Sequence, residues 1–164
     1  MTSDTNMLMR RARCLLAFFT VGLVLSGLTA VPLQIEVDIL NDLIGRGASF
    51  ASFWPEMASW ISRVHAGISA VHQEYPFIAY GTDWLAFAHI VIAIAFLGAI
   101  RNPVRNIWVV EFGMIACVLV VPLAMIGGGF RGIPMFWRLI DCAFGVFGII
   151  PLWLARRCIR RLAS

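Results

Sequence analysis

Residues 14–33 of the sequence read CLLAFFTVGLVLSGLTAVPL, twenty consecutive residues without a charged side chain. A helix of this length, at about 1.5 Å per residue, spans the roughly 30 Å hydrocarbon core of a bilayer. An arginine cluster at positions 10–13 precedes it, an arrangement that a cleaved signal peptide shares. A cut after Ala30 would place Leu28 where the cleavage site needs a small residue, so an uncleaved transmembrane helix is favoured.

Three further apolar runs follow, at about 84–100, 106–125 and 139–154. Hydrophobic residues make up 60% of the 164 residues and charged residues 13%, whereas an ordinary soluble domain carries about 25% charged residues. A small soluble fold buries too limited a share of its chain to hide this apolar surface. The sequence therefore predicts an all-α integral membrane protein, a four-helix bundle that forms one domain over residues 1–164.

A long polar region at 34–83 separates the first two runs. Its opening segment, 34–40, alternates polar and apolar residues and is compatible with an extension of the first helix or with a short strand. A helix is predicted from about Pro55, because proline suits the first turn and Glu56 favours the positive end of the helix dipole. Apolar residues then recur at the spacing of an amphipathic helix that lies on the membrane surface or caps the bundle: Met57, Trp60, Ile61, Val64, Ile68 and Val71.

All thirteen basic residues are arginines, and their distribution predicts the orientation of the chain. Nine of them flank the N-terminus, the turn at 101–105 and the C-terminus, whereas four lie in the opposite segments. Because cytoplasmic segments carry the excess of basic residues, both termini are predicted in the cytoplasm and the amphipathic helix in the periplasm. The membrane is then the bacterial inner membrane. Short arginine clusters beside apolar runs are typical of topology signals, so nucleic-acid binding is not predicted.

Ionisable residues inside a span cost at least about 2.5 kcal/mol each, so those present need a reason. His89 and Asp141 are both expected in the outer third of the membrane, with Asp83 and Arg138 nearer the outer ends of the same helices. Arg138 precedes Asp141 by about one helical turn, so an ion pair that anchors the helix end is one hypothesis. The other is an outward-facing polar pocket of all four residues, in which His89 and Asp141 pair directly or through water.

Glu111 lies in the third apolar run, near its cytoplasmic end. Arg101 and Arg105 are close enough in sequence to reach it, which predicts an inner-leaflet ion pair between the second and third spans; a carboxylate in a proton path is the alternative. Gly145 and Gly148 lie about one turn apart on the fourth span. Small residues at this spacing allow another helix to approach closely, either within the bundle or from a partner membrane protein or a second copy.

No motif in the sequence names a reaction: there is no P-loop, no GxGxxG, no GxSxG and no carboxylate pair at catalytic spacing. The glycine triplet at 127–129 lacks a following lysine and is expected in a flexible loop over 127–138. The four cysteines form no CxxC pair, and His65 and His72 are seven residues apart rather than three or four. No metal or cofactor is therefore predicted.

Three segments in the second half of the chain have a familiar pattern. They read GTDWLAFAHI at 81–90, RNPVRNIWVVEFG at 101–113 and RGIPMFWRLIDCAFG at 131–145. Together they resemble a family of small uncharacterised four-helix inner-membrane proteins of bacteria. The resemblance covers under half of the chain, and it implies a membrane fold without implying an activity or a functional residue.

Three functions remain compatible with these patterns. Small size, packing motifs and the missing catalytic constellations favour a non-enzymatic accessory, partner-binding or sensor protein in contact with the lipid bilayer. The first alternative is a transporter, or a small-molecule or lipid binder, with an outward-facing pocket around His89 and Asp141. The second alternative is a redox or lipid-processing membrane enzyme.

Overall fold

The four predicted spans are present as long helices. The computed structural model describes residues 3–163, and within them four helices are long and apolar enough to cross a membrane. They cover Asp4–Thr29, Pro76–Arg101, Ile107–Phe130 and Met135–Ala163. The prediction of an all-α, multi-pass membrane protein is therefore confirmed. Each helix is longer than its apolar run, because the flanking polar and arginine-containing residues continue the helix.

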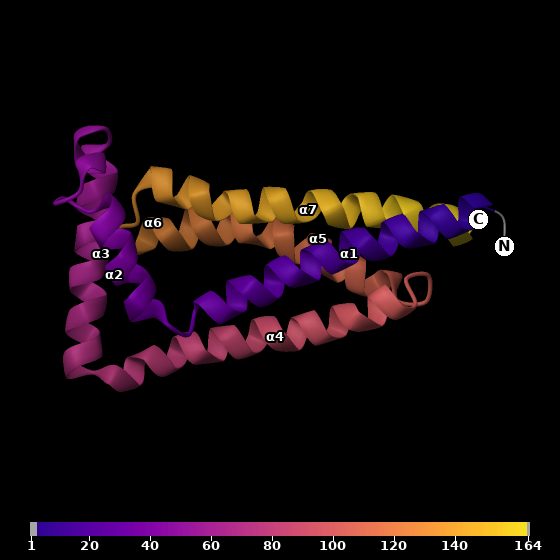
Figure 1. The fold of residues 1–164 in the computed structure, drawn as a ribbon, viewed down its shortest axis with the longest axis horizontal. Helices are drawn as coiled ribbons and strands as arrows, with labels where there is room; N and C mark the ends of the chain where they lie inside the picture. Colours follow the sequence, from indigo (N-terminus) through magenta and orange to yellow (C-terminus); the bar gives the residue numbers. More distant parts are fainter. Residues whose placement is uncertain (1–2, 164) are drawn as a thin grey trace. The chain divides into compact units, whose positions relative to one another are not determined.

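Figure 1 shows the elements in chain order. The spanning helices are α1 (Ser3–Thr29), α4 (Tyr80–Arg101), α5 (Ile107–Pro122) and α7 (Met135–Ala163). Between α1 and α4 lie α2 (Leu33–Ile44), the 3-10 helix η1 (Ser49–Ser52), α3 (Pro55–Glu74) and the 3-10 helix η2 (Pro76–Ala79). The π-helical segment η3 (Leu123–Gly127) and the single turn α6 (Gly128–Phe130) prolong α5.

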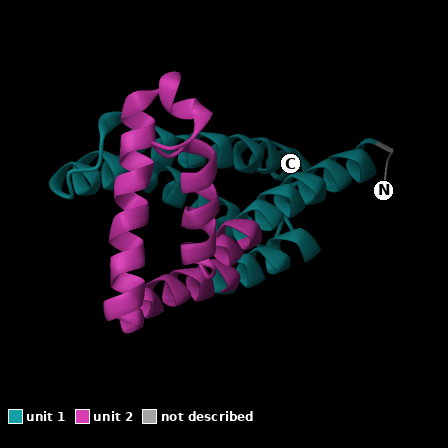
Figure 2. Ribbon diagram, turned by 60° about the vertical axis from the view of Figure 1, so that its left-hand side comes forward, with its two compact units in different colours: residues 1–23, 91–164 teal, residues 24–90 magenta. Residues whose placement is uncertain are grey.

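The chain divides into two compact units, which Figure 2 colours separately. Unit 1 comprises residues 1–23 and 91–164, and unit 2 comprises residues 24–90. The boundaries fall inside α1 and α4, so each of these two helices contributes to both units. Unit 1 also holds α5 and α7, whereas unit 2 holds the helix pair α2 and α3.

The core of unit 1 forms where parts of α1 and α4 pack with α5 and α7. Leu16, Phe96, Leu152 and Ile159 are fully buried there. The ring of Phe19 lies against that of Phe96, with 4.9 Å between the ring centroids, and α5 runs alongside α7 (Figure 1). Lipid tails are as apolar as these side chains, so tight van der Waals packing is what holds the helices together.

Glycines on α5 and α7 allow this close packing. A Cβ added to Gly113 would lie 2.7 Å from Cζ of Phe96, and one added to Gly145 would overlap the carbonyl oxygen of Cys117. A Cβ on Gly148 would lie 3.0 Å from the Cys117 Sγ. The predicted small-residue face of α7 therefore exists, but α5 of the same chain already occupies it. Gly145 and Gly148, predicted as a contact for a second copy or a partner, instead form a packing contact within the chain.

Residues 34–40 belong to a separate helix, α2, rather than to a strand or a continuation of α1. Pro32 precedes α2 and has no backbone N–H with which to extend the hydrogen-bond ladder of α1. At the other end of α2, the backbone N–H of Gly45 donates to the carbonyl of Asn41 at 2.8 Å. The helix predicted from Pro55 is confirmed as α3, so the region between the first two spans holds two helices where one was predicted.

Polar bonds join α2 to α3. Nε2 of His65 lies 2.9 Å from Oδ1 of Asp38, and Oγ of Ser62 donates to Oδ1 of Asn41 at 2.8 Å. A carboxylate oxygen can only accept, so the imidazole N–H of His65 is the donor. His65, expected at an exposed or interfacial position, is thus half-buried between the two helices. These bonds fix one face of α2 against α3.

Candidate functional site

Arg138 is held by the glycine-rich end of the third span. Its Nη1 donates to the carbonyl oxygen of Met125, in η3, at 3.2 Å. A Cβ added to Gly128 would lie 2.8 Å from Cγ and Cδ of Arg138, so only glycine lets the arginine stem lie against the helix backbone. Residues 127–130 are therefore helical instead of forming part of a flexible loop, and the loop shrinks to 131–134.

The predicted ion pair between Arg138 and Asp141 does not form. Arg138 turns instead toward the Met125 carbonyl, and its Nε is buried without a partner in the described residues. The half-buried carboxylate of Asp141 likewise has no hydrogen bond or ion pair within residues 3–163. Both side chains thus keep spare hydrogen-bonding capacity, which the anchoring hypothesis did not anticipate.

His89 lies where α4 meets the end of α1. Its Nδ1 is 2.8 Å from the carbonyl oxygen of Leu85, and because a carbonyl only accepts, Nδ1 must donate. In the neutral ring, Nε2 then remains as an acceptor. A Cβ added to Gly27 would lie 2.7 Å from the Cβ of His89, so a glycine on α1 makes room for the histidine.

The four residues predicted to form an outward-facing pocket are divided between the two units. Asp83, exposed in the first turn of α4, belongs to unit 2 together with His89. Arg138 and Asp141 belong to unit 1. Each unit is compact by itself, and the shared pocket stays a prediction.

Glu111 forms an ion pair, but with partners other than Arg101 and Arg105. Its Oε1 lies 2.8 Å from both Nε and Nη2 of Arg156, and Nη2 of Arg160 is 3.6 Å away. Arg156 pairs with Glu111 because α5 and α7 run side by side. Arg101 and Arg105 are nearer in sequence but do not form the pair. The ion pair therefore joins the third span to the fourth rather than to the second.

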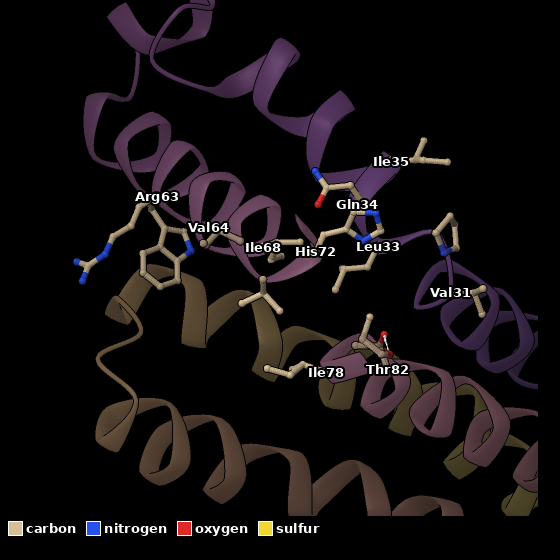
Figure 3. A pocket seen from close by; sticks show the side chains of 15 residues that line it. Val31, Leu33, Gln34, Ile35, Arg63, Val64, Ile68, His72, Ile78 and Thr82 are labelled. Atoms are coloured by element: carbon tan, nitrogen blue, oxygen red, sulfur yellow. Dashed lines mark hydrogen bonds between the residues drawn. The ribbon is translucent and has the colours of Figure 1, made fainter. Parts of the chain in front are cut away.

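A largely apolar cavity of about 800 Å³ lies within unit 2. Figure 3 shows side chains of α3 on one side of it and those of η2 and α4 on the other: Val64, Ile68 and His72 against Ile78 and Thr82. Two buried polar atoms of its lining residues, Oε1 of Gln34 and Nε1 of Trp60, have no partner in the described part of the chain. No sequence motif pointed to this cavity, because its walls come from four separate elements, α2, α3, η2 and α4.

An apolar stripe runs along the exposed face of α2. It consists of Ile35, Ile39 and Leu43, four residues apart, all of them exposed. The opposite face of α2 carries the buried Val37 and the bonds to α3. Within unit 2, this helix is therefore fixed on one side and uncovered on the other.

A second cavity, of about 560 Å³, lies in unit 1 at the arginine-rich ends of α1 and α7. Its lining combines cationic, apolar and thiol side chains: Arg11, Arg157, Arg161, Leu15, Leu154, Cys14 and Cys158. None of these residues was predicted to form a site.

Comparison of the chain with protein-family models, with curated proteins and with solved structures gave no match. The four candidate spans and the geometry of the two units are therefore the basis for functional inference.

Proposed function

We propose that the chain is a non-enzymatic accessory protein of the bacterial inner membrane, which binds a partner membrane protein through α2. The observation that carries this proposal is the stripe of Ile35, Ile39 and Leu43, which expose 61%, 55% and 66% of their surfaces. A helix that is held rigidly on one face and apolar on the other presents a ready surface for a second helix.

The charges on α2 favour a protein partner over the lipid surface. Helices that lie on a membrane are typically rich in basic residues, which attract anionic lipids. α2 carries the acidic residues Glu36, Asp38 and Asp42 and has no basic residue. Asp38 is already bonded to α3, so Glu36 and Asp42 remain beside the stripe, where they would repel an anionic membrane and suit a basic rim on a protein.

Site-specific photo-cross-linking in native membranes tests this proposal. A photoreactive residue at position 39 should give a discrete protein adduct. The photoreactive residue is then moved to position 35, so that position 39 can be varied. Ile39→Ser should abolish the protein adduct, whereas the matched change Ile39→Leu should retain it. Thermal unfolding of both variants checks that the α2–α3 pair stays folded. Adducts with lipid alone, or equal yields from both variants, would contradict a protein partner on this face.

The proposed orientation places both termini in the cytoplasm. Two observations support it. One is the nine-against-four distribution of arginines; the other is the cavity that Arg11 of α1 and Arg161 of α7 line together. A reporter that works only in the cytoplasm, fused after Ser164, should be active. A periplasmic reporter inserted near Gly47 should also be active, and a cytoplasmic result at Gly47 would reverse the topology.

A second candidate function is a transporter, or a small-molecule or lipid binder, with a polar pocket around His89 and Asp141. It is favoured by one observation: neither Nε2 of His89 nor the Asp141 carboxylate has a partner among the described residues. A double-mutant cycle on stability with His89→Leu and Asp141→Leu tests whether they share a site. Paired residues should show an interaction energy of about 0.5–3 kcal/mol. Strictly additive effects would show that His89 and Asp141 do not share a site.

A further inference from the structure

The cavity between α1 and α7 has a cationic end and an apolar end. Along α1, Arg11 lies one turn nearer the chain terminus than Leu15, and along α7, Arg157 lies nearer the terminus than Leu154. The leucines therefore lie nearer the middle of the two spans, whereas the arginines lie nearer the ends of the spans that face water. This order matches an amphiphile whose charged head lies at the membrane boundary and whose tail extends inward.

Three arginines at this end of unit 1 are bonded inside the protein. Arg13 donates to the carbonyls of Ile100 and Arg101, which lie at the end of α4. Arg156 and Arg160 surround Glu111. The guanidinium groups of these three residues are thus directed to partners inside the protein.

Arg11 and Arg157 have no carboxylate partner in residues 3–163, and both line the cavity. The guanidinium of Arg157 instead lies over the ring of Trp153, 4.7 Å from its centroid. A tryptophan at the end of a span is a typical anchor at the membrane–water interface, so the stacked arginine lies at headgroup depth. Among residues 3–163, no acidic residue lines the cavity.

We propose that this cavity binds an anionic glycerophospholipid, with Arg11 and Arg157 contacting the headgroup phosphate and an acyl chain lying beside Leu15 and Leu154. Basic pockets between spanning helices are suited to anionic headgroups, because guanidinium groups donate paired hydrogen bonds to phosphate oxygens. A zwitterionic phospholipid carries the same phosphate, but its ammonium group would lie beside the arginines of the cavity. Negative net charge is therefore the property that the cavity selects.

The native cysteines of the cavity provide a local readout. Cys14 and Cys158 line it, whereas Cys117 and Cys142 are buried elsewhere in unit 1. The full chain is placed in nanodiscs of phosphatidylcholine, or of an equal mixture with phosphatidylglycerol, and the modification of each thiol by a neutral maleimide is followed by peptide mass spectrometry. We expect phosphatidylglycerol to slow the modification of Cys14 and Cys158 several-fold.

Variants separate a bound lipid from a general effect of membrane charge. In the mixed nanodiscs, Arg11→Gln should restore fast modification of both thiols, and Arg157→Lys should restore it in part. Arg10→Gln is the matched control, because Arg10 has the same charge and lies on the same helix but does not line the cavity. It should leave the protection intact. Equal rates in Arg11→Gln and Arg10→Gln would overturn the proposal.

Two further arms distinguish the source of the phosphate. Glycerol phosphate added to phosphatidylcholine nanodiscs should give no protection, because it lacks the acyl chain. Native mass spectrometry of the detergent-solubilised protein should show retained phosphatidylglycerol, reduced in Arg11→Gln. Protection by phosphatidylcholine alone, or equal protection by the soluble phosphate, would show that the cavity does not select an anionic lipid.

Discussion

Gly145→Ala is predicted to destabilise the protein although it adds only one methyl group. The new Cβ would overlap the carbonyl oxygen of Cys117 on α5. That oxygen belongs to the backbone of a packed spanning helix, so it cannot rotate away as the end of a flexible side chain can. The two helices must therefore separate locally, and the contacts around this point weaken together.

The size of the effect follows from two opposing contributions. Overfilling a packed core costs about 1–3 kcal/mol, while replacing glycine with alanine inside a helix returns up to about 1 kcal/mol. We therefore expect Gly145→Ala to lower the free energy of unfolding by about 1–2 kcal/mol, a factor of about 5–30 in the folded-to-unfolded ratio.

Two matched glycines calibrate this prediction. A Cβ on Gly148 would lie 3.0 Å from the Cys117 Sγ and 3.3 Å from Cε2 of Phe19, both of them side-chain atoms that can move. A Cβ on Gly22 would meet nothing within 4 Å. The assay is reversible unfolding from mild detergent into dodecyl sulfate, followed by tryptophan fluorescence. The free energy of unfolding should be lowest for Gly145→Ala, higher for Gly148→Ala and highest for Gly22→Ala. If Gly145→Ala unfolds at the same midpoint as Gly22→Ala, α5 and α7 do not pack at this glycine.

Two further predictions concern polar pairs. A double-mutant cycle with Glu111→Gln and Arg156→Gln should show a coupling of about 1 kcal/mol in the same assay, because the pair is partly exposed to solvent; additive effects would place the two side chains apart. Tyr75, outside the spans, donates to Oε1 of Glu74 at 2.7 Å, and this bond to a carboxylate raises the pKa of the Tyr75 hydroxyl. In a Tyr80→Phe background, absorbance should show Tyr75 ionising at lower pH after Glu74→Gln, and an unchanged titration would exclude the bond.

The spans could be predicted from the sequence because each depends on local composition alone. Twenty apolar residues must cross a bilayer or be buried, whatever they pack against. The same reasoning located α3 from Pro55 onward. It did not resolve 34–40, since an alternating pattern fits both a strand and a helix with only Val37 buried. The choice between them depends on α3, which is distant in sequence.

Partner choice could not be predicted for the polar residues. Glu111 was assigned to Arg101 and Arg105 because they are near in sequence, yet Arg156 binds it from forty-five residues away. Arg138 was assigned to Asp141, one turn away, yet it binds a backbone carbonyl at the end of the preceding helix. In each case the partner depends on which helix lies beside the polar residue, and sequence distance does not give this.

The cavity at the arginine-rich end left a signal in the sequence that an arginine count does not use. Leu154, Arg157, Cys158 and Arg161 follow one another at intervals of three, one and three residues, which places them along one face of α7, and Arg11 and Leu15 share a face of α1 in the same way. Their neighbours Arg156 and Arg160 lie on a different face of α7, directed toward Glu111. A rule that only counts basic residues treats all of them as equal contributors to orientation. Helical spacing divides them into arginines that neutralise a carboxylate inside the bundle and arginines directed to a cavity. Loss of Arg156 should therefore weaken the fold, whereas loss of Arg11 should leave the fold intact and change only what the cavity binds.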